Sequence, residues 1–272
     1  MLGAVIGDIV GSPFEFDQHR EAAYSRKYQL ISENSYFTDD SVMTLAVADA
    51  LMKVMPHKGD KVSEADFEKQ AIKSMQEFGR AYPHAGYGSK FYYWLMKKNP
   101  TPYNSWGNGS AMRVSPVAWA FDDLESVENF AAASSRISHN SPEGIRGAKA
   151  TAGAIFLART GKSKDEIKNY ICEKYYYDLS RSLDDIRKTY HHVESCQQTV
   201  PEAITAFLVG ENFEDVARSA VSLSGDSDTL TAIACSIAEG FYGIPDEITN
   251  MANEKLDEYL REVIDKWENW RN

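Results

Sequence analysis

The chain has 272 residues, of which 43% are hydrophobic and 25% charged, and its formal net charge is −11. No apolar stretch reaches the about 20 residues that a membrane-spanning helix needs, so we expect no membrane partner. The negative charge also disfavours nucleic acid, because binding the phosphate backbone needs a concentrated positive face. Length and composition are those of one large globular unit, and we expect a single domain over residues 1–272.

The N-terminal segment and the cysteines favour a cytoplasmic location. The apolar run 1–16 has no basic residue ahead of it and carries Asp8 within it, unlike a secretory signal. Three cysteines, at 172, 196 and 235, form an odd set without C-x-x-C spacing, so neither a disulfide framework nor a thiolate zinc site is indicated. We therefore expect a cytoplasmic protein.

Apolar residues recur at helical spacing along most of the chain, while the alternating pattern of strands is almost absent. This pattern predicts an all-α fold. In chain order, helices are expected over 64–82, 124–136, 142–159, 201–209, 213–223, 229–242 and 253–270, with another after the capping box of Ser163 and Glu166. The aromatic segment 175–192 is the least regular and is expected to form a surface excursion, with His191 and His192 as surface histidines.

The first predicted helix carries Gly3, Gly7 and Gly11 at four-residue spacing, which places the three glycines on one face. Another backbone can approach such a face closely. Two interpretations remain open here: tight helix packing, or a ligand that comes near the helix beside Asp8.

Two acidic segments resemble one another, "TDDSVMTLAVADAL" at 38–51 and "DSDTLTAIACSIAEGF" at 226–241. Each places two carboxylates and a hydroxyl residue ahead of a helix of small and apolar residues. Ordinary N-capping explains either segment alone. Because both helices look buried, however, their carboxylates would need protons or a cation. An all-oxygen ligand set suits Mg²⁺, Mn²⁺ or Ca²⁺ rather than zinc, and two clusters could hold a pair of ions.

Other catalytic motifs are absent. "TGKS" at 160–163 resembles part of a phosphate-binding loop, but Phe156 occupies the position where that loop needs glycine. The chain has no H-E-x-x-H, no His-Asp pair and no G-x-S-x-G, which removes the zincin, His-Asp phosphohydrolase and serine-hydrolase signatures.

Four blocks of sequence together resemble the ADP-ribosylglycohydrolase family, of the dinitrogenase reductase-activating glycohydrolase type. They are "GAVIGDIVGSPFEF" (3–16), "FTDDSVMTLAVADAL" (37–51), "SWGNGSAMRVSPVAW" (105–119) with "SHNSPEGIRGA" (138–148), and "SGDSDTLTAIACSIAEGFYG" (224–243). Their order and spacing extend the resemblance over nearly the whole chain.

The resemblance implies an all-α domain with a binuclear Mg²⁺ or Mn²⁺ centre in a cleft that binds the ribose next to the scissile bond. The implied metal ligands are Thr38, Asp39, Asp40, Asp226, Asp228 and Thr229. The candidates for proton transfer are Glu15, Asp39 and Asp228. The residues expected to contact the ADP portion are Ser105, Trp106, Gly107, Asn108, Gly109 and His139. Arg113 is expected to pair with acidic groups in the core rather than to contact substrate.

The activity implied by the resemblance is hydrolysis of the bond between ADP-ribose and a modified protein side chain, with arginine slightly preferred as the acceptor. A serine linkage or a small ADP-ribose conjugate remains an alternative substrate. Two other classes of function also remain open, namely a module that binds ADP-ribose without cleaving it and a dimetal phosphohydrolase that acts on nucleotides.

Overall fold

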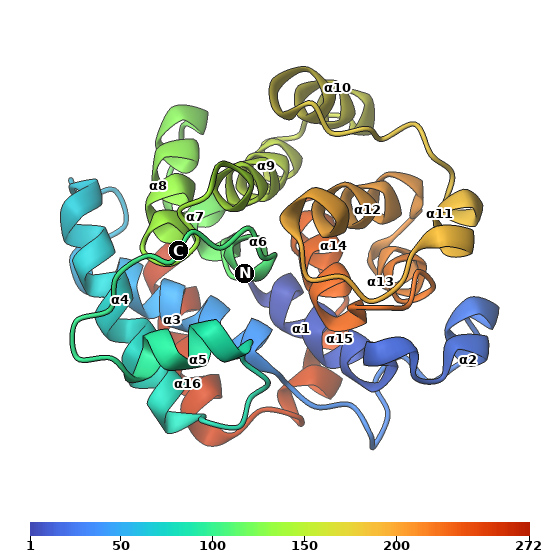
Figure 1. Cartoon of the computed structure of the whole chain (residues 1–272), viewed down its shortest axis with the longest axis horizontal. Helices are drawn as coiled ribbons and strands as arrows, with labels where there is room; N and C mark the ends of the chain where they lie inside the picture. Colours follow the sequence, from blue (N-terminus) through green and yellow to red (C-terminus); the bar gives the residue numbers. More distant parts are fainter.

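Helices joined by loops make up the computed structural model, which describes all residues 1–272 (Figure 1). The only strand-like pairing is an isolated antiparallel bridge between Gly107 and Ser195. The elements are α1 (Leu2–Gly11), η1 (Ser12–Asp17), α2 (Arg20–Ser25), α3 (Asp39–Val54), α4 (Glu64–Ala81), α5 (Ser89–Met96), α6 (Gly109–Met112), α7 (Ser115–Ala120), α8 (Leu124–Arg136), α9 (Pro142–Arg159), α10 (Lys164–Tyr175), α11 (Leu183–Thr189), α12 (Cys196–Val209), α13 (Phe213–Val221), α14 (Ser227–Tyr242), α15 (Asp246–Asn253) and α16 (Glu258–Arg271). The predicted all-α fold is confirmed.

Local capping signals account for the helices that were predicted with correct bounds. The Ser141 side chain accepts a hydrogen bond from Gly144 N at the start of α9, and the capping box of Ser163 and Glu166 opens α10. Caps of this kind satisfy N–H groups that the helix itself leaves unpaired.

Five predicted helices need correction. The helix expected over 64–82 ends at Ala81, and the helix expected over 229–242 begins at Ser227. The helix expected over 201–209 already begins at Cys196, with Pro201 inside it. The helix expected over 213–223 ends at Val221. The helix expected over 253–270 is interrupted: α15 ends at Asn253, and α16 begins only after Asp257, whose carboxylate accepts a hydrogen bond from Leu260 N. Residues 175–192, expected to be an irregular excursion, contain the short helix α11.

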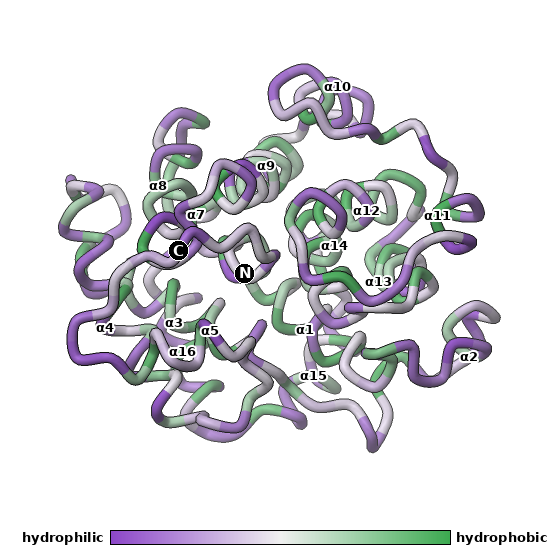
Figure 2. Tube along the Cα trace, in the orientation of Figure 1, coloured by the Kyte–Doolittle hydropathy of each residue, from purple (hydrophilic) through white to green (hydrophobic).

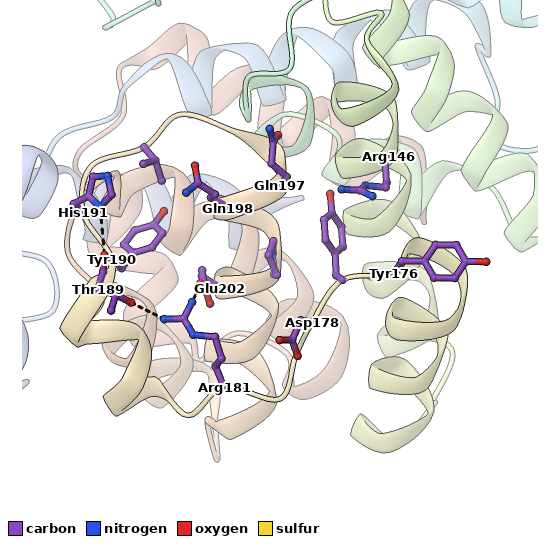
Figure 3. Close-up of a pocket in the computed structure, with 13 residues that line it drawn as sticks. Arg146, Tyr176, Asp178, Arg181, Thr189, Tyr190, His191, Gln197, Gln198 and Glu202 are labelled. Atoms are coloured by element: carbon purple, nitrogen blue, oxygen red, sulfur yellow. Dashed lines mark hydrogen bonds and ion pairs between the residues drawn. The ribbon is translucent and has the colours of Figure 1, made fainter.

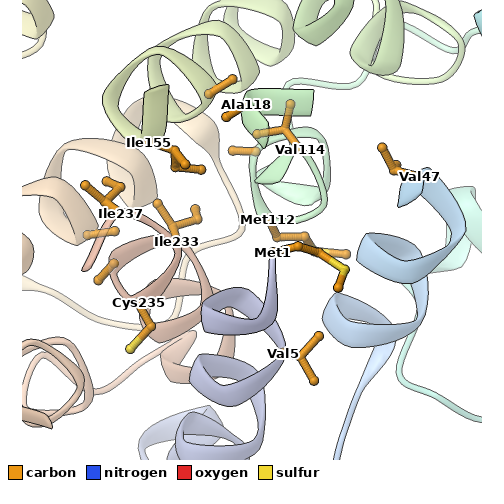
Figure 4. Close-up of a cluster of buried hydrophobic side chains, with 14 of the residues drawn as sticks. Met1, Val5, Val47, Met112, Val114, Ala118, Ile155, Ile233, Cys235 and Ile237 are labelled. Carbon is orange, nitrogen blue, oxygen red and sulfur yellow. The ribbon is translucent and has the colours of Figure 1, made fainter. Parts of the chain in front are cut away.

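Helix α14 lies at the centre of the fold and packs against α1, α9, α12 and α13. It is buried along almost its whole length, as is α1. Figure 2 shows hydrophobic residues gathered on these central helices and hydrophilic residues along peripheral ones such as α2 and α10. The buried apolar side chains form one continuous cluster, and Figure 4 shows part of it where side chains of α1, α3, α9 and α14 meet around Met112. None of the helices is both long and apolar enough to cross a bilayer.

The three glycines of α1 serve helix packing. A Cβ added at Gly3 would collide with the backbone of Cys235, one at Gly7 with Thr231, and one at Gly11 with Ser227 and Asp228. The two helices therefore run antiparallel with their backbones in contact, in a register that advances by four residues on each. The structure thus favours the packing interpretation of these glycines over a ligand beside them.

We expect Gly7→Ala to destabilise the protein by about 1–3 kcal/mol or more, because the new methyl group would lie 2.7 Å from the Cα of Ala232 and cannot be accommodated without moving α1. Urea unfolding measures this change. Gly88→Ala is the matched control, because its added Cβ meets nothing within 4 Å and its φ is −54°. The control should change stability by less than about 0.5 kcal/mol. Equal stability of the two variants would contradict the close packing of α1 on α14.

Candidate functional site

The fully buried Asp8, on α1, holds the start of α3. Its carboxylate accepts hydrogen bonds from the backbone N–H groups of Thr38 (2.8 Å) and Ser41 (3.0 Å) and from both hydroxyls, with Thr38 Oγ1 at 2.7 Å. Thr38 in turn caps α3 by accepting from Asp40 N. These bonds place the first acidic segment against α1.

The glycine register of α1 sets the second acidic segment beside the first. Gly11 lies at the C-terminal end of α1 against the first residues of α14. The chain then enters η1, which carries Glu15. As a result, carboxylate oxygens of Glu15, Asp226 and Asp228 all lie within 4.8 Å of one another.

The carboxylates of the two acidic segments are nearly inaccessible to water. Asp40, Asp226 and Asp228 are 2%, 5% and 4% exposed. Thr229 Oγ1, on α14, donates to Asp40 Oδ2 at 3.2 Å, which links the two helix starts directly. Asp40 Oδ1 is buried without any hydrogen-bond partner. Segments almost 190 residues apart in sequence therefore meet as one acidic cluster.

The pKa values of this cluster are raised, first because burial disfavours the charged form and then because the carboxylates repel one another. Burial raises the pKa of Asp226 to about 6, and burial together with the charge of Asp228 raises the pKa of Glu15 to about 8. For the same two reasons the pKa values of Asp39, Asp40 and Asp228 lie well above their usual range. No lysine, arginine or histidine nitrogen lies within 4 Å of these carboxylates.

The cluster fits a hard divalent cation. Its donors are carboxylate and hydroxyl oxygens only, which is the ligand chemistry of Mg²⁺ and Mn²⁺. The orphaned Asp40 Oδ1 and the absence of a protein cation leave negative charge that an ion would neutralise. Asp39 and Asp40 lie in the first turn of α3, and Asp228 in the first turn of α14, where the helix dipole offsets only part of that charge.

A cavity of about 740 Å³ opens over the cluster and contains all but one of the site residues predicted from the sequence. Thr38 is the exception; its hydroxyl donates to Asp8 and accepts from Asp40 N, which leaves one lone pair free. The predicted residues that line the cavity are Glu15, Asp39, Asp40, Ser105, Trp106, Gly107, Asn108, Gly109, His139, Asp226, Asp228 and Thr229. The structure thus brings together residues from five separate parts of the chain.

The glycine-rich segment 105–109 is attached to the acidic cluster through Asn108. Its side-chain amide donates to Asp226 at 2.6 Å and to Thr199 Oγ1 at 3.0 Å, so this amide nitrogen holds a carboxylate in place. The Trp106 side chain is 56% exposed at the rim of the cavity. The helix that follows the segment, α6, is only four residues long.

The structure corrects the expectation for Arg113. This residue was expected to pair with acidic groups, but its guanidinium has no carboxylate partner. Nη2 instead donates to Ser134 O and to Ser138 Oγ, both at 2.9 Å, and the Phe91 ring lies 5.3 Å away. Arg113 is fully buried.

Several lining residues were not found by sequence reasoning. Phe91 and Tyr103 lie with their ring centroids 6.0 and 5.7 Å from that of His139, and form one end of the cavity. At the acidic end, His192, expected to be a surface histidine, lies 4.6 Å from the exposed Phe16 ring. No local pattern marks these residues, because each reaches the cavity only through the packing of its own element.

A second cavity of about 480 Å³ adjoins the first and shares Val193 and Gln198 with it. Figure 3 shows its polar lining, which comes from α9, α12 and the chain between α10 and α12. Two of its charged groups pair with each other, since Arg181 Nη1 donates to Glu202 at 2.8 Å, and Arg181 Nη2 donates to Thr189 Oγ1 at 2.7 Å. We therefore assign no chemistry to this cavity.

Comparisons with known proteins place the whole chain in one family. The ADP-ribosylglycohydrolase family profile matches residues 1–272. Human ADP-ribosylhydrolase ARH3 is 26% identical, over 95% of this chain and 88% of its own length. ADP-ribosylarginine hydrolase Tri1 of Pseudomonas putida is 24% identical, over 98% of this chain and 77% of its own length.

Similarity of fold extends to solved structures. A chain of an ADP-ribosylglycohydrolase-related protein complex superposes with a TM-score of 0.61 over 94% of this chain and 96% of its own, at 20% identity. That likeness concerns the fold. Together with the family match over every residue, it confirms the resemblance inferred from the four blocks of sequence: this chain belongs to the ADP-ribosylglycohydrolase family.

Proposed function

We propose that the protein hydrolyses the glycosidic bond between ADP-ribose and a modified protein side chain and releases ADP-ribose, with the help of two divalent cations, Mg²⁺ or Mn²⁺. The observation that carries the proposal is the meeting of two distant acidic segments, with one carboxylate oxygen of Asp40 left unpartnered, on the floor of a cavity of about 740 Å³. Such a cavity has the size of a small-molecule site.

The ions would be held by the six oxygen-bearing residues at the starts of α3 and α14, namely Thr38, Asp39, Asp40, Asp226, Asp228 and Thr229. Bound there, they would supply positive charge that orients the ribose hydroxyls and activates water. The protein prepares this arrangement in advance, because Asp8 fixes the start of α3 and Asn108 fixes Asp226.

Glu15 is best placed of the three candidates to transfer a proton. It is half-buried, faces the cavity, and lies beside Asp226 and Asp228. In the metal-free protein, burial and the charge of Asp228 raise the pKa of Glu15 to about 8. Cations bound beside it would lower this pKa. A carboxyl group in this position can exchange a proton with water or with the leaving group. Cleavage also requires a water molecule held next to the anomeric carbon of the ribose. Asp39 and Asp228, which line the floor of the cavity, would hold this water.

The ADP portion is assigned to the end of the cavity formed by residues 105–109, Phe91, Tyr103 and His139. Buried aromatic rings there offer apolar surface for a base. The acceptor side chain would leave through the acidic end, past the exposed ring of Phe16. Aromatic faces beside an acidic site suit a guanidinium group, which favours arginine as the acceptor. The relative Tri1 is named an ADP-ribosylarginine hydrolase.

The test is turnover on peptides of one sequence that carry ADP-ribose on arginine or on serine. We expect free ADP-ribose from the arginine-linked peptide in Mg²⁺ or Mn²⁺, less from the serine-linked peptide, and none in EDTA. Faster release from the serine-linked peptide would reverse the acceptor preference. If the protein binds ADP-ribose tightly but releases none from either peptide, it is a binding module and not a hydrolase. Release of nucleotide monophosphate would indicate a phosphohydrolase.

A further inference from the structure

A buried cation that touches no carboxylate lies behind the ADP end of the cavity. Arg113 has no exposed surface, and its Nε and Nη1 atoms are buried without hydrogen-bond partners. A guanidinium buried in this way is costly, because its N–H groups lose water without full replacement. Arg113 borders the cavity, but its guanidinium nitrogens have no accessible surface, so it does not contact a ligand directly in this arrangement.

Arg113 acts instead on one hydroxyl group. Its Nη2 donates to Ser138 Oγ at 2.9 Å, and Ser138 Oγ lies 2.8 Å from Nδ1 of His139. A guanidinium only donates, so one lone pair of Ser138 Oγ is occupied. Ser138 is fully buried, and the only acceptor within hydrogen-bond distance of its own proton is His139 Nδ1.

The direction of this bond determines which ring nitrogen of His139 carries the proton. If the Ser138 hydroxyl donates to Nδ1, that nitrogen is an acceptor and the proton of the neutral ring must sit on Nε2. The doubly protonated ring is disfavoured as well, since burial and the nearby charge of Arg113 both lower the pKa of His139. The ring is therefore held neutral with an Nε2–H group.

The Nε2 atom faces the glycine-rich segment across the cavity. A Cβ added at Gly109 would lie 3.2 Å from it, and one added at Gly107 would lie 3.6 Å from it. His139 lines the cavity, and Nε2 makes no hydrogen bond within the protein, so its proton is free for a ligand oxygen. Because Gly107 and Gly109 have no side chains, space beside Nε2 stays open for a ligand oxygen.

We propose that Arg113 and Ser138 are positioning residues that fix His139 as the Nε2–H tautomer, so that the ring presents a hydrogen-bond donor to an oxygen of bound ADP-ribose. The proposal rests on the proposed function for the identity of the ligand. The tautomer itself is a property of the free protein and can be tested without any ligand.

The first experiment reads the tautomer from long-range ¹H–¹⁵N spectra of the full-length protein, with the His139 signals assigned from their loss in His139→Gln. We expect a protonated Nε2 and an unprotonated Nδ1 in the wild type. Ser138→Ala and Arg113→Met should give a mixture of tautomers or a switch to Nδ1–H, while Arg113→Lys, which retains a charged donor, should restore the Nε2–H form at least in part. Ser135→Ala is the matched control, since Ser135 Oγ donates to the backbone oxygen of His139 and not to its ring.

The second experiment measures the dissociation constant of free ADP-ribose in Mg²⁺. Ser138→Ala should weaken binding roughly three- to tenfold, because His139 Nε2 is then no longer held as a donor and its hydrogen bond to the ligand is lost or weakened. In a His139→Gln background, the glutamine side chain always carries N–H groups and does not depend on Ser138 to become a donor. Adding Ser138→Ala to this background should therefore change the dissociation constant by less than about twofold. If Ser138 had only a structural role, Ser138→Ala would weaken ADP-ribose binding by the same factor in the wild type and in His139→Gln.

An Nδ1–H or doubly protonated His139 in the wild type would overturn the proposal, as would an equal loss of affinity in both backgrounds. If the wild type shows the Nε2–H tautomer but does not bind ADP-ribose, the proposed function fails while the relay from Arg113 through Ser138 stands.

Discussion

Asp228→Ala is expected to lower the affinity for Mn²⁺ and the turnover together, each by at least roughly 100-fold. Residues that only support a metal ligand typically contribute 10- to 100-fold, so the loss of a ligand should reach or exceed the upper end of that range. The carboxylate of Asp228 lies in the first turn of α14 beside Asp226 and Glu15. Asp39→Ala, on α3, should produce the same paired loss.

The control for this prediction is Asp265→Ala. It removes the same charge from an exposed position on α16, where the side chain makes no hydrogen bond or ion pair, and should leave metal affinity and turnover unchanged. Calorimetric titration with Mn²⁺ and a single-turnover assay measure the two quantities. Wild-type turnover in Asp228→Ala or Asp39→Ala would contradict the assignment of these residues to a metal centre.

Without metal, the protein is expected to lose stability as the pH rises from about 5 to 8. An unfolded aspartate releases its proton near pH 4, whereas burial keeps the pKa of Asp226 at about 6 in the folded chain. Between these values the folded state binds more protons than the unfolded state, so the free energy of unfolding falls as the pH rises. For Asp226 alone the loss is on the order of 3 kcal/mol over the whole range from below pH 4 to above pH 6, about half of it above pH 5, and the loss continues toward pH 8 as Glu15 ionises.

Added Mn²⁺ should reverse this loss, because an ion replaces the protons that hold the cluster together. Urea unfolding in EDTA and in Mn²⁺ should therefore give a larger difference at pH 8 than at pH 5. Asp226→Asn, which keeps the shape of the side chain but cannot ionise, should reduce both the pH slope and the effect of Mn²⁺. A metal-free stability that is flat or rises between pH 5 and 8 would show that the carboxylates do not repel one another as the structure requires.

The parts of the fold and the site that sequence predicted are those with local chemical signals. The capping residues Ser141 and Ser163 locate two helices because a cap and the N–H groups that it satisfies are neighbours in sequence. The two acidic segments could be paired because each combines carboxylates with an unusually apolar helix, and such carboxylates need a partner. The glycine spacing of α1 was compatible with helix packing or with a nearby ligand, and only the structure shows that the backbone of α14 lies against it.

The parts that could not be predicted depend on contacts between residues far apart in the chain. The bond from Asn108 to Asp226 joins residues 118 positions apart, and neither segment contains a sign of the other. Arg113 was expected to seek an acidic partner because buried charges usually do. The fold instead supplies Ser138 and the Phe91 ring, and neither could be inferred from the sequence around Arg113. The start of α16 has a local cause, since Asp257 caps it. The start of α12 at Cys196 does not, because Ser195 makes no side-chain capping bond there.

The most direct test of the metal centre is an anomalous diffraction experiment on crystals soaked in Mn²⁺. We predict two anomalous peaks between the start of α3 and the start of α14, within ligand distance of Asp40 and Asp228. A map without a peak between these helix starts at saturating Mn²⁺ would contradict the account of this site.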